Sequence, residues 1–141
     1  AVECETLPVT AHSNGLIVEP QDMRWADGQW SAHAHLLIRG KKPGDFVELT
    51  IPAKGTSPRR VTLYSTRASD YGTMKFTVNG HQVEETFDGY APTPIPSGPI
   101  PLGVFSPKGG KIVLRAELTG TNPLAQGDRY LAALDAGVVG E

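Results

Sequence analysis

Apolar and polar residues alternate along several short stretches of this chain. The clearest is 111–118, where Ile112, Leu114, Ala116 and Leu118 occupy every second position. Successive side chains of a β-strand point to opposite faces of a sheet, so this pattern predicts a strand with one buried face. The other stretches predicted as strands are 2–6, 16–18, 31–38, 45–51, 59–65, 73–78, 81–87, 102–105 and 129–139.

Glycine and proline separate these stretches, with 16 glycines and 12 prolines spread along the chain. The pair Asn79-Gly80 is a strong signal for a β-hairpin. Residues 88–101 are rich in proline and cannot form a central strand, because proline lacks the N–H that such a strand needs. No helical period extends past two turns. We therefore predict an all-β fold, a two-sheet antiparallel β-sandwich of the jelly-roll kind.

Length and charge narrow the class of protein. A chain of 141 residues suits one domain, placed here over 1–141. The formal net charge of −2 disfavours nucleic-acid binding, and no apolar stretch approaches the roughly 20 residues of a membrane span. Cys4 is the only cysteine, which excludes an internal disulfide. Without a signal peptide the chain is either cytoplasmic or trimmed. The lack of a starting Met favours trimming, so we expect a bacterial protein that is secreted, periplasmic or at the cell surface.

The sequence gives little sign of catalysis. The Gly-x-Ser-x-Gly pattern of a nucleophile elbow is absent. A glycosidase needs two carboxyl groups facing each other across a cleft, and no motif marks such a pair. We predict that the domain is not an enzyme, and hydrolysis of a glycan by the purified chain would contradict this.

Two groups of side chains could hold a metal ion. His33 and His35 lie two apart on a predicted strand and would share a face, although histidines placed in this way more often meet solvent or a hydrogen-bond partner. Glu3 and Glu5 alternate on the first predicted strand, and Asp135 lies on the last. The first and last strands of a sandwich are often neighbours, and three carboxylates suit Ca²⁺. The alternative is an exposed acidic edge.

Aromatic side chains in or beside predicted loops suggest a sugar ligand. Trp25, Trp30, Tyr71 and Tyr90 could stack on the apolar faces of sugars, with loop polar groups bonding the hydroxyls. The alternative is that Trp30 and one tyrosine belong to the core. The loop polar residues are Asp70, Asp88, Asn122, Asp128 and Arg129. The predicted ligand contacts are Trp30, His33, Asp70, Tyr71, Tyr90, Asn122 and Arg129.

Several segments in order resemble known β-sandwich modules. They include Val2-Glu3-Cys4-Glu5, Gly28-Gln29-Trp30-Ser31, Asp70-Tyr71-Gly72, Gly120-Thr121-Asn122-Pro123 and Leu134-Asp135. The set resembles the modules that accompany DUF2961 (glycoside hydrolase family 172-like) proteins and large secreted planctomycete proteins. More remotely it is similar to the galactose-binding-like carbohydrate-binding modules of families 6 and 35.

The resemblance implies a function and a cofactor. Family 6 and 35 modules hold a structural Ca²⁺ with a Glu-x-Glu strand and an Asp-bearing last strand, which match Glu3, Glu5 and Asp135 here. Cys4 departs from the usual small residue between the two glutamates, and a buried thiol behaves as a small hydrophobe. The loop before the last strand often contributes an Asn, matched by Asn122. We therefore expect a non-catalytic module that binds a poly- or oligosaccharide and is attached to a catalytic or redox domain. The alternative is a structural jelly roll that mediates oligomer contacts without a glycan.

Overall fold

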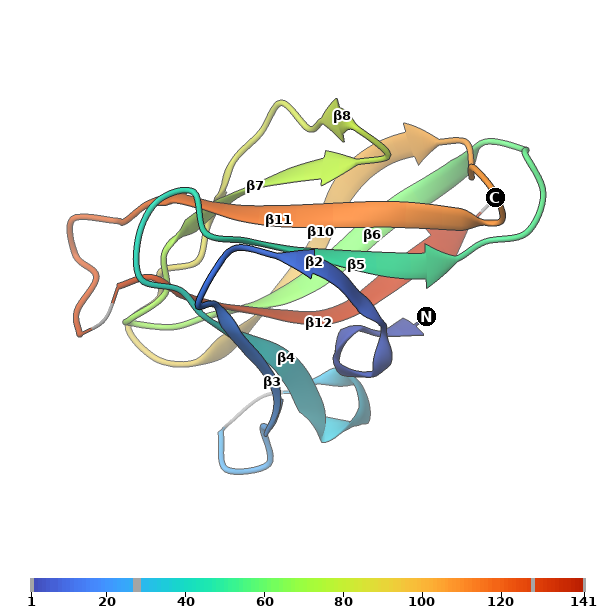
Figure 1. Cartoon of the computed structure of the whole chain (residues 1–141). Helices are drawn as coiled ribbons and strands as arrows, with labels where there is room; N and C mark the ends of the chain where they lie inside the picture. The colour runs from blue at the N-terminus through green and yellow to red at the C-terminus, as the bar shows by residue number, and fades with distance from the viewer. Residues whose placement is uncertain (1, 27–28, 128, 141) are drawn as a thin grey trace.

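The computed structural model describes residues 2–26, 29–127 and 129–140, which form two antiparallel sheets packed face to face (Figure 1). This confirms the predicted two-sheet sandwich. Sheet A contains β10 (Ile95–Phe105), β6 (Arg59–Arg67), β12 (Leu131–Gly140), β4 (Ala34–Arg39) and β3 (Ile17–Asp22) in that order, and β1 (Val2–Glu3) also pairs with β12. Sheet B contains β2 (Val9–His12), β5 (Phe46–Pro52), β11 (Lys111–Gly120), β7 (Thr73–Val78) and β8 (His81–Gln82) in that order, and β9 (Phe87–Asp88) also pairs with β7. Within the described ranges, no helix is long and apolar enough to cross a membrane.

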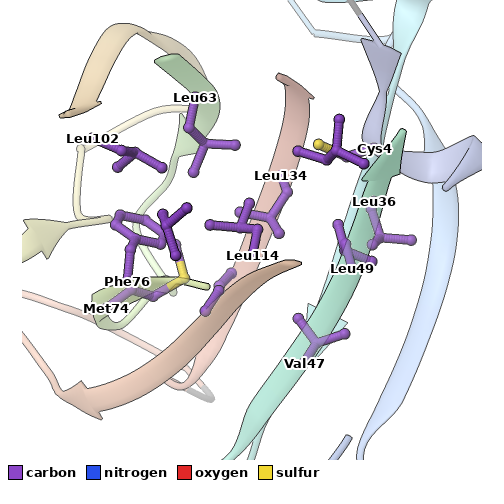
Figure 2. Packing of buried hydrophobic residues seen from close by; sticks show 14 of the residues in the cluster. Cys4, Leu36, Val47, Leu49, Leu63, Met74, Phe76, Leu102, Leu114 and Leu134 are labelled. Carbon is purple, nitrogen blue, oxygen red and sulfur yellow. The ribbon is translucent and has the colours of Figure 1, made fainter. Parts of the chain in front are cut away.

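The main core lies between the sheets and is built from the alternating residues. Leu114 of β11 and Phe76 of β7 contribute from sheet B, and Leu63 and Leu134 contribute from sheet A (Figure 2). All four are at most 1% exposed. Alternation therefore identified the buried face of β11 correctly. Cys4 also lies in this core, fully buried, and burial raises the pKa of its thiol.

A second, smaller apolar cluster covers the other face of sheet A. Leu36 faces the main core, so its neighbour Leu37 faces outward. There Leu37 packs with Ala68, Tyr71 and Ala133. This cluster attaches the loop between β6 and β7 to the outer face of sheet A. Sheet A is therefore covered on both faces near β4, and the loop carrying Tyr71 has a fixed position.

The proline-rich segment becomes an edge strand. The exclusion of a central strand holds, because β10 lies at one edge of sheet A, but the strand begins at Ile95 rather than at the predicted residue 102. Its register with β6 shifts between Pro96 and Pro99 and again between Pro101 and Gly103. Prolines are tolerated here because an edge strand has one side without a partner.

Three other predicted strands are shorter than expected. The stretch 31–38 begins with the 3-10 turn η2 (Ser31–His33), in which Ala32 and His33 have φ of 52° and 57°. The stretch 2–6 keeps only β1, since η1 (Cys4–Thr6) follows at once. The stretch 81–87 keeps only β8 and β9 at its ends. Alternation alone does not distinguish a strand from a tight turn over three residues.

Candidate functional site

Three carboxylates meet where the two ends of the chain pair. Glu3 of β1 stands opposite Ala136 of β12, which places it beside Asp135. On one side, β12 pairs with β4 up to Leu134 and then with β1 from Ala136 onward. Asp135 lies between these two pairings. One carboxylate oxygen from each of Glu3, Glu5 and Asp135 lies within 4.8 Å of the others. The predicted set is therefore brought together, although by the turn η1 and not by alternation of Glu3 and Glu5 along a strand.

The hydrogen bonds of this carboxylate triad leave two of its oxygens without a partner among the described residues. The backbone N–H of Ser31 donates to Asp135 at 3.1 Å (Oδ1) and 3.2 Å (Oδ2). The Ser31 hydroxyl donates to Glu3 Oε1. Glu3 Oε2 and Glu5 Oε1 are buried and accept no hydrogen bond within the described residues. Buried acceptors without partners are costly, so these two oxygens call for a cation or ordered water.

The electrostatics of the triad also favour a cation. The pKa of Asp135 is raised to about 6, chiefly by burial and then by the charges of Glu3 and Glu5, against the Ser31 N–H, which lowers it. Burial and the charge of Glu3 also raise the pKa of Glu5. Three clustered acids repel one another when ionised, and a divalent cation would remove that repulsion. Hard carboxylate oxygens are the ligands that Ca²⁺ takes, so the residues present fit this ion.

The two histidines do not form a metal site. His33 lies exposed in the 3-10 turn η2, whereas His35 is fully buried in β4. The predicted shared face was wrong because the strand starts only at Ala34. His35 Nδ1 lies 2.7 Å from Thr66 Oγ1 and its Nε2 lies 2.6 Å from Gln21 Oε1. Burial lowers the pKa of His35 to about 4, so the ring is neutral at neutral pH.

A cleft of about 370 Å³ opens on the outer face of sheet A, above the smaller apolar cluster. The loop after β3 supplies Trp25, which is 63% exposed. The loop after β6 supplies Asp70 and Tyr71, and Tyr71 is almost fully buried in the floor. The wall formed by β3 and β4 supplies Gln21 and Arg39. The cleft thus combines an exposed indole with donors and an acceptor, the mixture expected of a ligand site.

The Arg39 side chain of the cleft is paired with Glu19. Arg39 Nε donates to Glu19 Oε1 at 2.7 Å, and both side chains are about half exposed. A guanidinium has five N–H donors, so this bond leaves others available. The cleft can therefore offer a charged donor group beside Asp70 without ordering a free arginine on binding.

The other predicted contacts lie elsewhere. Trp30 is 5% exposed, and it lines a separate hollow with His33. Asn122 Nδ2 donates to Asp88 Oδ2 at 2.7 Å, and its Oδ1 accepts the N–H of Leu124, so its amide ties its own loop to β9. Tyr90 is half-buried and follows Asp88, whose Oδ1 accepts its N–H. Arg129 is exposed and has φ of 65°. Asp128 falls outside the described ranges. Of the seven predicted contacts, the cleft contains Asp70 and Tyr71.

Gln21 and Arg39 were missed by sequence reasoning. Both lie on strands, whereas the polar groups expected to bond the sugar hydroxyls were those of predicted loops. Trp25 was among the loop aromatics but not among the predicted contacts. The available signal was its position in a predicted loop, a position that Trp30 shares although Trp30 is buried. A polar residue on the outward face of a strand carries no such signal.

No protein-family model matches the sequence, and no curated protein matches it. Solved structures do match over almost the whole chain. A family 35 carbohydrate-binding module from Paenibacillus barcinonensis has a TM-score of 0.58 at 20% identity, covering 99% of this chain and 97% of the module. A family 36 module in complex with calcium and xylotriose has a TM-score of 0.52 at 11% identity, covering 98% and 97%. These similarities show that the fold is that of carbohydrate-binding modules.

A xanthan lyase from Paenibacillus contains a similar segment. The TM-score is 0.79 at 22% identity, over 98% of this chain. The chain spans 13% of the length of that lyase. The resemblance of the sequence to family 35 modules agrees with the similarity of the fold to such a module. The resemblance to DUF2961 and planctomycete proteins stays a prediction.

Proposed function

We propose that this domain is a non-catalytic carbohydrate-binding module whose glycan lies in the cleft on the outer face of sheet A. The observation that carries the proposal is the exposed indole of Trp25 beside Asp70, Arg39 and Gln21. Indole faces stack on the C–H surfaces of sugars, while carboxylate, guanidinium and amide groups bond hydroxyls. Affinity should be modest, because a few contacts offset the cost of association only in part.

The same proposal places a Ca²⁺ ion at the carboxylate triad. Glu3, Glu5 and Asp135 would hold it, and the two oxygens without partners would become ligands. The ion would supply positive charge to neutralise the triad and would tie β1 to β12. Because only the folded chain brings the three carboxylates together, binding would stabilise the fold by linkage. The role of the ion is structural, since none of the three carboxylates lines the cleft.

We further propose that the domain works as part of a larger secreted, periplasmic or cell-surface protein. The support is that a similar fold forms a small part of a xanthan lyase. Another similar structure is a CBM35-containing β-1,4-mannanase from Podospora anserina, of which this chain covers 26%. A module of this kind would hold an attached catalytic or redox domain close to its polysaccharide.

The test is a binding screen with Ca²⁺ present, using xylotriose, β-1,3-galactotriose and xanthan as probes by isothermal titration or affinity gels. Trp25→Ala should weaken binding of the best probe at least about tenfold, in line with the loss of a stacking aromatic. The control is Val104→Ala, which removes an equally exposed apolar side chain on β10. Equal binding by both variants would refute the cleft as the site. No binding by the wild type together with a dimer in solution would favour the assembly role.

A further inference from the structure

A chain of buried hydrogen bonds runs from the loop beside the carboxylate triad to the cleft. The indole Nε1 of Trp30 donates to Thr66 Oγ1 at 2.7 Å. Thr66 Oγ1 lies 2.7 Å from His35 Nδ1, and His35 Nε2 lies 2.6 Å from Gln21 Oε1. Thr66 and His35 are fully buried and Trp30 nearly so, while Gln21 reaches the cleft. The rings of Trp30 and His35 also meet edge to face, with centroids 6.5 Å apart.

With Oε1 of Gln21 facing His35 Nε2, the chemistry of the four groups sets the direction of each bond. An indole N–H only donates, so Thr66 accepts from Trp30 and keeps its own proton to give. The amide oxygen of Gln21 only accepts, so His35 must carry its proton on Nε2. Nδ1 of the neutral ring is then the acceptor for the Thr66 hydroxyl. This arrangement satisfies all three bonds and leaves the amide NH₂ of Gln21 outside the chain of hydrogen bonds.

We propose that His35 is a positioning residue that fixes the amide of Gln21, so that the cleft receives its N–H donors and not its carbonyl oxygen. This inference rests on the proposed function, because the amide N–H groups of Gln21 would donate hydrogen bonds to oxygens of the glycan. With the side-chain oxygen tied to His35, Gln21 keeps one amide orientation and loses less freedom on binding. The cleft then presents donors from Gln21 and Arg39 together with the acceptor Asp70.

Substitutions of Thr66 can separate the effect of its hydrogen bonds from the effect of its packing. Thr66→Val keeps the shape of the side chain but removes the hydroxyl, which leaves both Trp30 and His35 without their partner. Thr66→Ser keeps the hydroxyl and serves as the matched control. Gln21→Met removes the donor itself while leaving the strand intact.

The first measurement is the tautomer of His35 in the ¹⁵N-labelled protein by NMR at pH 7, which needs no glycan. We expect a neutral ring with its proton on Nε2. A proton on Nδ1 would overturn the positioning role whatever the domain binds. The expected tautomer in a wild-type domain that binds none of the probes would refute the proposed function, and with it the service of Gln21 to a glycan.

The second measurement is a double-mutant cycle on the affinity for the best probe of the screen. Thr66→Val and Gln21→Met should each weaken binding about five- to tenfold, the range expected for one hydrogen bond. Thr66→Ser should bind within about twofold of the wild type. The double variant Gln21→Met/Thr66→Val should be no weaker than Gln21→Met alone, since Thr66 acts through Gln21. Additive losses, or an unaffected Thr66→Val variant, would overturn the inference.

Discussion

Replacing Asp135 by Asn should stabilise the calcium-free protein at neutral pH and destabilise the calcium-loaded one. The folded pKa of Asp135 is about 6, against an ordinary value of 3.8. Above pH 6 the folded chain carries a charge that it holds unfavourably, whereas below pH 3.8 the acid is neutral in both folded and unfolded chains. The free-energy cost of ionising Asp135 in the folded chain therefore grows as the pH rises from 3.8 to about 6. An asparagine at 135 carries no such cost and can still accept the Ser31 N–H through one oxygen.

The size of the effect follows from the pKa difference. One pKa unit corresponds to about 1.4 kcal/mol, so the upper bound at pH 7 is about 3 kcal/mol. Glu3 and Glu5 are only half-buried, and water screens their charges, so we expect about 1–2 kcal/mol. For a domain of this size that corresponds to roughly 3–6 °C in Tm. Calcium at a hundred times its Kd should add about 2.7 kcal/mol to the wild type alone.

The assay is urea or thermal unfolding of wild type and Asp135→Asn at several pH values from 4 to 7, in EDTA and in Ca²⁺. The difference between the two proteins is the quantity to follow, because other groups titrate in the same window. The pKa of His35 is lowered to about 4 by burial, so its contribution to stability is lost as the pH falls from about 6.5. Subtraction removes this contribution, which opposes that of Asp135.

Two results would refute this reasoning. A stability difference in EDTA that does not change between pH 4 and pH 7 would mean that the pKa of Asp135 is not raised in the folded protein. A calcium response in Asp135→Asn equal to that of the wild type would mean that the triad does not hold the ion. Glu84→Gln, at an exposed position, is the control for a simple change of net charge.

Two further substitutions test how the loops are held. Gly72→Ala would place a methyl group 2.9 Å from the carbonyl oxygens of both Gly120 and Arg129, so we expect a loss of about 1–3 kcal/mol in urea unfolding, while Gly140→Ala, with no atom within 4 Å, should change little. Asn122→Ala should cost about 1 kcal/mol through its lost bond to Asp88 yet alter glycan affinity less than twofold, and titration beside a thermal melt would check both values. Weaker binding with an unchanged Tm would instead make Asn122 a glycan contact.

The sandwich could be predicted because alternation depends on local sequence alone. Strand β11 follows its predicted faces, and Cys4 is buried as the small hydrophobe that the resemblance implied. The carboxylate triad could be predicted because first and last strands are often neighbours. The turn η1 that completes it could not, since Glu5 reaches Asp135 only after the strand ends.

The cleft was predicted in part. Asp70 and Tyr71 lie where the smaller apolar cluster attaches their loop, and that cluster depends on which strands lie side by side in sheet A. His35 looks like a surface residue in an alternating strand. It is buried because Trp30, from an irregular turn, covers that face of the sheet. Long-range coverage of this kind leaves no periodic signal in the sequence.

The prolines at the edges of sheet A have a consequence for how copies of this protein meet. Pro20 lies in β3 and Pro96, Pro99 and Pro101 lie in β10, the two strands that end the sheet. Each proline removes an N–H that a strand from another molecule would need, and the register shifts of β10 interrupt its ladder further. Another molecule would therefore find no unbroken edge at β3 or β10 on which to extend sheet A. Under the proposed function, copies that gather on one polysaccharide would not join one another through sheet A.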